Sequence, residues 1–203
     1  MPIATIILAA GSSTRLGGTP KQLLTYQNET LVRRIANTAL SLEVGPVIAV
    51  LGANENMIRS ELADLPIHIT VNPDWQEGMA SSLRIGLNAL SDESVDAFLV
   101  VLTDQPYVTS DLLRQLITTQ EQTVKGIVAC HYGEKDNLGV PALFDIRYKA
   151  HFLNLSGDTG ARKFIQQYRN DCAEVSFPLA NIDLDTWQDV EKWQGARGKE
   201  LGA

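Results

Sequence analysis

The sequence predicts an α/β fold in which helices cover both faces of a mostly parallel, twisted β-sheet. Short apolar segments alternate with amphipathic ones along most of the 203 residues, and an alternation of this length is typical of such a sheet. Residues 4–9 and 96–102 are almost entirely apolar, as expected for strands that are buried on both faces. The first of these runs ends in a loop that contains Gly11, Gly17 and Gly18.

Four strands and three helices are predicted up to residue 102. The strands are residues 4–9, 46–51, 67–71 and 96–102, and the helices are residues 30–43, 54–64 and 79–90. The helix at 30–43 places Leu31, Ile35 and Ala39 on one face, which is the spacing of an amphipathic helix. A further helical segment is expected directly after Lys21.

Beyond residue 102 the alternation weakens. We expect helices at 110–122, 158–169 and 186–194, strands at 126–131 and 173–177, and a loop followed by a strand over 137–144. Asp158 or Thr159 is the expected N-cap of the helix at 158–169, because their side-chain oxygens accept hydrogen bonds from the first N–H groups of a helix. Trp187, Val190 and Trp193 should form the apolar face of the last helix.

One domain over residues 1–194 accounts for this organisation, followed by a frayed tail over residues 195–203. The formal net charge of −7 argues against a protein that coats nucleic acid.

Cys130 and Cys172 lack metal-site spacing and are expected to be free thiols. No apolar run is long enough to span a membrane, and no basic segment precedes the first one. We therefore expect no membrane anchor, no signal peptide and a cytoplasmic location.

The stretch from Thr5 to Leu24 carries the strongest functional signal. An apolar strand enters a glycine-containing loop that holds Arg15 and Lys21 in an otherwise acidic chain. Glycine lets backbone N–H groups approach phosphate closely, while Arg suits a phosphate fork and Lys a point contact. We interpret the stretch as a nucleoside triphosphate site. The competing interpretation is an ordinary strand–helix turn with a solvated Arg and Lys.

Three other phosphate-binding loops do not fit this stretch. A dinucleotide fingerprint requires G-x-G-x-x-G, but Ser12 and Ser13 follow Gly11. A P-loop requires G-x-x-x-x-G-K-[ST], and the spacing from Gly11 to Gly17 is one residue too long. A kinase-type glycine loop lies between two strands, whereas a helix is expected after Lys21.

Acidic residues follow predicted elements at the sheet edge where open α/β sheets bind ligands. Asp104 comes just after the fourth strand and is placed to hold Mg²⁺, which prefers one or two carboxylates together with substrate phosphates. Thr109 already offers a cap for the next helix, which weakens a capping role for Asp104. Asp183 and Asp185 point the same way if their segment is extended. One of them is a second candidate metal ligand, and capping of the last helix is the alternative.

A third segment of interest, residues 72–83, begins as a loop and becomes a helix. Gly78 lets the backbone come close to a ligand. Ser81 and Ser82 open a helix whose N-terminus favours anions or carbonyl acceptors. Packing is the simpler role for Trp75. The three histidines show no metal or catalytic spacing and are given no role.

The pattern L-A-A-G-x-S-x-R-L-G-x-x-x-K-x-L-L at residues 8–24 resembles the signature of a known enzyme family. These are the nucleotidyltransferases related to molybdenum cofactor guanylyltransferase and cytidylyltransferase. Within them the chain is most similar to the cytidylyltransferase (MocA-like) branch, because the guanylyltransferase branch usually has glycine where Ala10 stands. Later segments match in order, so the resemblance covers nearly the whole chain. It implies a Rossmann-like nucleotide-diphospho-sugar transferase fold.

The resemblance also implies roles for individual residues. Asp104 would be the principal Mg²⁺ ligand and Asp185 the second one, while Arg15, Lys21 and Asp104 would be catalytic. Ala80 replaces one serine of the family pattern, and Trp187 replaces a proline. The residues expected to contact the nucleotide are Leu8, Ala9, Ala10, Gly11, Ser12, Ser13, Arg15, Lys21, Gly78, Ser81 and Ser82.

The acceptor side carries weaker signals. The segment Gly139-Val140-Pro141 and the segment G-D-T-G-A-R at residues 157–162 resemble family segments that line the acceptor pocket. The expected acceptor-binding residues are Gly139, Pro141, Asp158, Thr159, Gly160 and Arg162. A plain intrahelical pair between Asp158 and Arg162 is the competing account, because these residues lie at i and i+4 of the predicted helix.

The sequence and the resemblance together predict a Mg²⁺-dependent nucleotidyltransferase. The resemblance makes CTP the nucleotide and molybdopterin carrying molybdenum the acceptor, with pyrophosphate released. A molybdoenzyme or its maturation chaperone is the protein partner that the resemblance allows; nucleic acid and membranes are not expected as partners. Two alternatives stay open. One is transfer to another phosphorylated acceptor, such as a methylerythritol or sugar phosphate. The other is a non-catalytic carrier or maturation factor for the cofactor.

Overall fold

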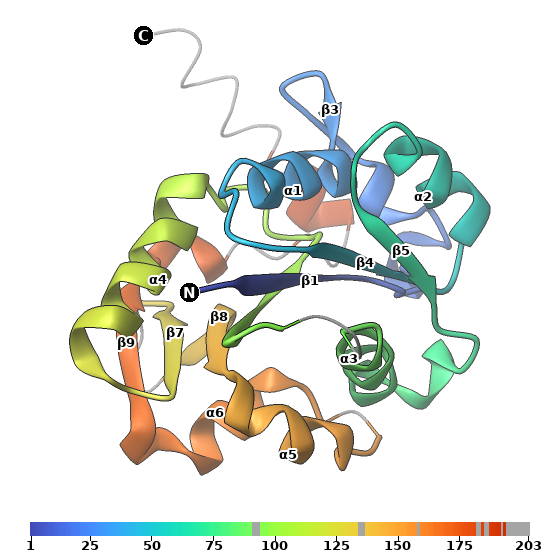
Figure 1. Ribbon diagram of the computed structural model, residues 1–203. Helices are drawn as coiled ribbons and strands as arrows, with labels where there is room; N and C mark the ends of the chain where they lie inside the picture. The colour runs from blue at the N-terminus through green and yellow to red at the C-terminus, as the bar shows by residue number, and fades with distance from the viewer. Residues whose placement is uncertain are drawn as a thin grey trace, which may run out of the picture.

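A single twisted sheet forms the centre of the molecule (Figure 1). The computed structural model describes residues 1–90, 94–133, 137–157, 159–181, 184, 187–191 and 193. Within them the sheet has seven strands. From one edge to the other these are β5 (His68–Val71), β4 (Val47–Leu51), β1 (Ile3–Ala9), β6 (Ala97–Leu102), β8 (Leu138–Asp145), β7 (Ile127–His131) and β9 (Cys172–Ser176).

Most strand pairings are parallel, which confirms the predicted fold class. The pairs β1–β4, β1–β6, β4–β5 and β7–β9 are parallel, and of the described strands in this seven-stranded sheet only β8 runs antiparallel to its two neighbours. The central strand β1 is buried along its whole length. A strand covered on both faces must be apolar on both faces, so it is a continuous apolar run rather than an alternating one.

Helices pack on both faces of the sheet, and each face has its own apolar core (Figure 1). The core on one face includes Ile7 of β1 and the helices α1 (Leu31–Leu40), α2 (Glu55–Leu62) and α4 (Ser110–Thr123). The core on the other face includes Ile6 and Leu8 of β1 and the helices α3 (Met79–Asn88), α5 (Lys149–Leu153) and α6 (Ala161–Gln167). Successive residues of β1 therefore stabilise opposite layers.

The structure corrects two local predictions. The segment after Lys21 is only a 3-10 turn (η2, Lys21–Leu23), and a short hairpin follows it before α1 begins. This hairpin consists of β2 (Thr25–Tyr26) and β3 (Glu29–Thr30). Helix α6 begins at Ala161 with Gly160, and not Thr159, as its N-cap; Asp158 lies outside the described residues. The short helix α5 was not predicted.

Three residues of the last described segment pack beside the loop after β1. Leu184, Val190 and Trp193 are buried in a third apolar cluster with Leu16 and Leu31, and the ring of Trp193 stacks on that of Tyr26. Residues 187–191 are helical, in agreement with the predicted last helix. Trp187, however, is 47% exposed, so it does not belong to the buried face that Val190 and Trp193 form. The predicted tail at 195–203 lies outside the described residues.

Both cysteines are free, as predicted, and both are buried. Burial disfavours the thiolate, and it raises the pKa of Cys172 to about 11 and that of Cys130 further still. Neither thiol is therefore a nucleophile at neutral pH. None of the helices within the described ranges combines the length and the apolar character that a membrane crossing requires.

The C-terminus of α4 offers a test of the backbone conformation. Val124, the C-cap residue, has φ 57° and is 87% exposed. A side chain with a Cβ costs about 1–2 kcal/mol in this left-handed region, and glycine avoids that cost. We expect Val124→Gly to raise Tm by about 2–4 °C in thermal unfolding. Val124→Ala keeps the Cβ and should give a smaller rise, so an equal rise in both variants would contradict the assigned conformation.

Candidate active site

A cavity of about 320 Å³ opens where β1 and β6 end. The two strands are paired in parallel with Leu8 opposite Leu102, so the loops that follow them leave the sheet at the same level. The cavity is therefore at the carboxyl edge of the sheet, where open α/β folds bind ligands. It is lined by the predicted nucleotide-contacting residues Leu8, Ala10, Gly11, Ser12, Lys21, Gly78 and Ser82, and by Asp104. Ala9, Ser13 and Ser81 do not line it.

The loop after β1 is held in place by Gln22, whose importance the sequence analysis missed. Gln22 is 1% exposed. Its Nε2 donates to the carbonyl oxygens of Ala9, at 3.2 Å, and Gly11, at 2.8 Å. Ser13 adds a second brace, because its Oγ accepts from the backbone N–H of Lys21 at 2.9 Å. The sequence contains one hint of this role. Gln22 is a polar residue between Lys21 and two leucines, and the alternation of apolar and polar residues in a helix does not account for its burial.

Lys21 and Asp104 meet at one end of the cavity. The Nζ of Lys21 lies 2.5 Å from Oδ2 of Asp104, and the two side chains are 19% and 12% exposed. Oδ1 of Asp104 is buried and has no hydrogen-bond partner among the described residues. Asp104 does not cap α4, since the side chain of Thr109 accepts from the N–H of Leu112 there. The Asp104 carboxylate thus has one oxygen held by Lys21 and one oxygen without a partner among the described residues.

The donor set around Asp104 fits a hard divalent cation whose coordination is completed by substrate. Within the described ranges, no group of three or more His, Cys, Asp or Glu residues could hold a metal ion. Mg²⁺ keeps several waters and commonly binds one or two carboxylates together with phosphate oxygens. Oδ1 of Asp104, which is buried and has no partner among the described residues, is therefore sufficient as a first protein ligand. The second predicted ligand, Asp185, lies outside the described residues. Its neighbour Leu184 packs in the same cluster as Leu16 of the β1 loop.

The start of α3 also lines the cavity, and its contacts separate the roles of two serines. Asn72 is 1% exposed, and its Nδ2 donates to Oγ of Ser81 at 2.8 Å and to Oγ of Ser82 at 3.0 Å. Ser81 in turn donates to the carbonyl of Gly78 at 2.8 Å. Ser81 thus shapes the turn, whereas Ser82 lines the cavity. Trp75 also lines the cavity, beyond the packing role expected from sequence.

A second cavity, of about 290 Å³, lies beside the first. The predicted acceptor residues Gly139, Gly160 and Arg162 line it together with Lys163, while Pro141 and Thr159 do not. The guanidinium of Arg162 donates to Oδ1 of Asn137 at 2.8 Å. Asp158 lies outside the described residues, so the alternative of a pair between Asp158 and Arg162 stays a prediction.

The amide of Gln105 braces this second cavity. It is 5% exposed, and its Nε2 donates to the carbonyl of Val140 at 2.9 Å and to the hydroxyl of Tyr132 at 3.2 Å. The Tyr132 hydroxyl donates to the same carbonyl. Oε1 of Gln105 is buried without a partner among the described residues.

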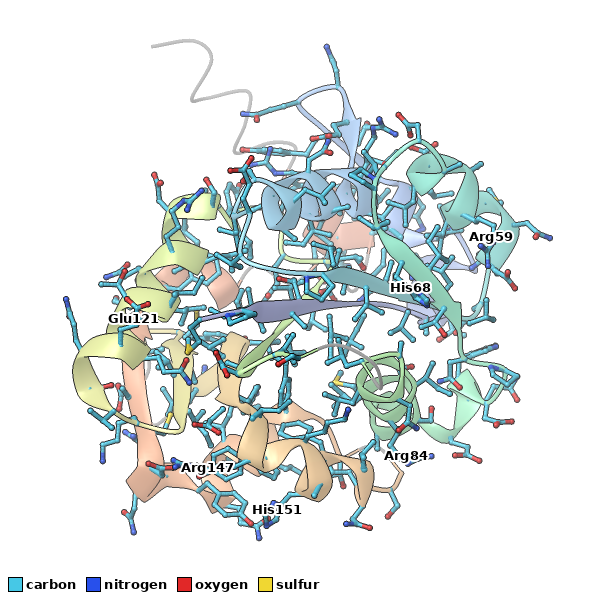
Figure 2. The ribbon with its side chains drawn as sticks, viewed as in Figure 1. Arg59, His68, Arg84, Glu121, Arg147 and His151 are labelled. Carbon is cyan, nitrogen blue, oxygen red and sulfur yellow. The ribbon has the colours of Figure 1, made fainter. Side chains whose placement is uncertain are left out.

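Other predicted functional groups lie outside the described part of the chain or away from both cavities. The side chain of Arg15 and the residues Asp158, Asp183 and Asp185 lie outside it. The histidines line neither cavity. Figure 2 shows His68 on β5, the edge strand, and His151 on α5 pointing outward.

Comparison with known proteins connects this geometry to a family. The family model described as MobA-like NTP transferase domain matches residues 5–172. Nicotine blue oxidoreductase of Paenarthrobacter nicotinovorans is 33% identical, over 94% of this chain and 96% of its own length. A molybdenum cofactor guanylyltransferase of Shewanella frigidimarina is 28% identical, over 91% of each chain.

Solved structures agree with these sequence relationships. The crystal structure of Rv0371c from Mycobacterium tuberculosis matches with a TM-score of 0.81 and 30% identity, over 95% of this chain and 96% of that one. A second structure of Rv0371c, in complex with manganese, matches with a TM-score of 0.77 and 28% identity, over 95% and 97% of the two chains.

Replacement of Gln22 tests the bracing of the β1 loop. In Gln22→Leu the carbonyls of Ala9 and Gly11 lose their shared donor, and leaving buried polar groups unpaired costs about 1–3 kcal/mol. We expect Tm to fall by several degrees in thermal unfolding without ligand. Gln115→Leu, on the exposed face of α4, is the matched control and should change the free energy of unfolding by less than about 0.5 kcal/mol. Equal effects would mean that Gln22 braces nothing.

Proposed function

Because the chain belongs to the MobA-like NTP transferase family, we propose that it transfers a nucleoside monophosphate from a nucleoside triphosphate to a phosphorylated acceptor. Nucleotidyl transfer is the activity that the family and its relatives support. The observation that carries the proposal is the Lys21–Asp104 pair, which lies at 2.5 Å beside a cavity bounded by the β1 loop. A cation and a carboxylate held this way provide a contact for phosphate and a ligand for a divalent cation.

In the proposed reaction an oxygen of the acceptor phosphate attacks the α-phosphorus in line. The bond from that phosphorus to the bridging oxygen of the β-phosphate breaks, and pyrophosphate leaves with the electron pair. The protein supplies no covalent nucleophile, because such catalysis depends on positioning and charge neutralisation. Lys21 stabilises charge at the α-phosphate, and Arg15 holds the β- and γ-phosphates. The backbone of residues 9–11 contacts the base.

Asp104 and Asp185 are the proposed ligands of Mg²⁺. When bound, the ion neutralises phosphate charge and orients the two reacting groups. Support comes from the unpartnered Oδ1 of Asp104 and from the structure of Rv0371c in complex with manganese. The Lys21 ammonium holds the Asp104 carboxylate in place through Oδ2, so that Oδ1 is the atom left for the ion.

CTP and a molybdopterin-type acceptor are the proposed substrates. Ala10 supports CTP through the resemblance to the cytidylyltransferase branch, and the relative named molybdenum cofactor guanylyltransferase supports the acceptor. Arg162 and Lys163 on the second cavity provide positive charge for the acceptor phosphate. A molybdoenzyme or its maturation chaperone would then receive the product.

A second candidate function is oxidation–reduction, favoured by the 33% identity to nicotine blue oxidoreductase over almost the full length of both chains. Incubation with NADH or NADPH and nicotine blue distinguishes the two. Oxidation of the dinucleotide at a rate that Lys21→Ala leaves unchanged would support this candidate. Pyrophosphate release from a nucleoside triphosphate that requires Lys21 would support nucleotidyl transfer.

Removal of either member of the pair tests the proposed mechanism. We expect Lys21→Ala or Asp104→Ala to lower kcat for pyrophosphate release by roughly 10²–10³, because each removes a preorganised charged group. Lys149→Ala and Asp111→Ala, which lie on α5 and α4 away from both cavities, are the controls. Turnover near the wild-type level in both site variants would overturn the assignment.

Nucleotide choice is tested by thermal unfolding with CTP, GTP, ATP and UTP, each with and without Mg²⁺. A ligand at about 100 times its Kd stabilises the folded state by about 2.7 kcal/mol, which raises Tm by roughly 5–10 °C. We expect a Mg²⁺-dependent rise with CTP alone. A rise with GTP instead would place the chain with the guanylyltransferases, and no rise with any nucleotide would favour the carrier alternative.

A further inference from the structure

The two cavities share a wall. Met79, the first residue of α3, and Leu102, the last residue of β6, line both of them. Leu102 is held in the sheet by its pairing with Leu8. Met79 is 36% exposed, and an unbranched thioether side chain adapts its shape easily. Met79 is therefore the adjustable part of the wall.

Gly160 fixes where the Met79 side chain can lie. A Cβ on Gly160 would lie 2.6 Å from Sδ of Met79 and 3.7 Å from its Cγ and Cε. The φ of Gly160 is −89°, which any residue adopts, so an added Cβ would meet no backbone strain and would instead displace the flexible end of the Met79 side chain. The same loop is joined to the start of α3 by a hydrogen bond of 3.3 Å from the N–H of Ala80 to the carbonyl of Gly157.

We propose that Met79, seated on Gly160, is a positioning residue that sets the boundary between the nucleotide and the acceptor. The inference rests on the proposed function, which assigns the first cavity to the nucleotide and the second to the acceptor. Gly160 lines only the second cavity. A methyl group added at Gly160 would therefore push the thioether away from the second cavity and into the nucleotide cavity.

The contact itself can be observed without any ligand. The chain contains three methionines, so a protein labelled with ¹³C at the methionine methyl groups gives three NMR signals, and Met79→Leu identifies that of Met79. We expect Gly160→Ala to shift the Met79 signal and to leave that of Met57 unchanged. Met57 is on α2 and lines neither cavity.

The functional consequence is measured by calorimetry, with the nucleotide that gives the largest Tm rise in the panel above. We expect Gly160→Ala to raise the Kd about tenfold, because the displaced Met79 thioether would overpack the nucleotide cavity when the ligand is bound. The double variant Met79→Ala/Gly160→Ala should bind within about twofold of Met79→Ala alone, because the clash is gone. Met57→Ala is the matched control and should bind as the wild type does. A merely structural role for Gly160 would show no such rescue.

The outcomes separate this inference from the proposed function. If the wild type binds no nucleotide, the proposed function fails and the inference fails with it. If the wild type binds nucleotide but Gly160→Ala leaves both the Kd and the Met79 signal unchanged, only the inference is overturned. A double variant as weak as Gly160→Ala would overturn it too. Should Gly160→Ala not fold, Met79→Phe adds bulk to the wall without altering the loop and should raise the Kd, while Met57→Phe should not.

Discussion

The parallel pairing of β1 with β6 is the constraint on which the site depends. Because Leu8 lies opposite Leu102, the loops after the two strands begin side by side. Lys21 and Asp104 are 83 residues apart in sequence, yet this register brings their charged atoms into contact. A shift of the register would move one loop along the sheet and separate the pair. The buried apolar residues of both strands make such a shift costly.

Three buried side-chain amides hold the irregular loops that line the cavities. Gln22 braces the β1 loop, Asn72 the start of α3, and Gln105 the second cavity. Loops leave carbonyl and N–H groups that no strand or helix satisfies, and burying such groups unpaired is unfavourable. An amide carries both donors and acceptors, so one side chain satisfies several of these groups. The cavities keep their shape through these contacts rather than through apolar packing alone.

The same region leaves two acceptors without partners among the described residues. They are Oδ1 of Asp104 and Oε1 of Gln105, on adjacent residues that line the first and second cavities respectively. An unsatisfied buried polar atom costs about 1–3 kcal/mol. Both acceptors belong to residues that follow Leu102 closely in sequence, and Leu102 and Met79 line both cavities. The two unpartnered oxygens therefore belong to the residues that line the cavities proposed for the nucleotide and the acceptor.

The sequence alone predicted the strand–helix alternation and pointed to Lys21 and Asp104, which the fold brings together at one cavity, because periodicity and the residue types that follow a strand are local signals. The prediction of the N-cap of α6 was wrong, because Gly160 occupies that position. The prediction of a helix after Lys21 was also wrong, because the 3-10 turn η2 and the β2–β3 hairpin occupy that segment. Only the tertiary structure decided that Ser81 braces a turn while Ser82 lines a cavity, that Gln22 holds the β1 loop, and that Met79 lies on Gly160. Each of these depends on residues brought together by folding, and no local pattern encodes which side chains will meet.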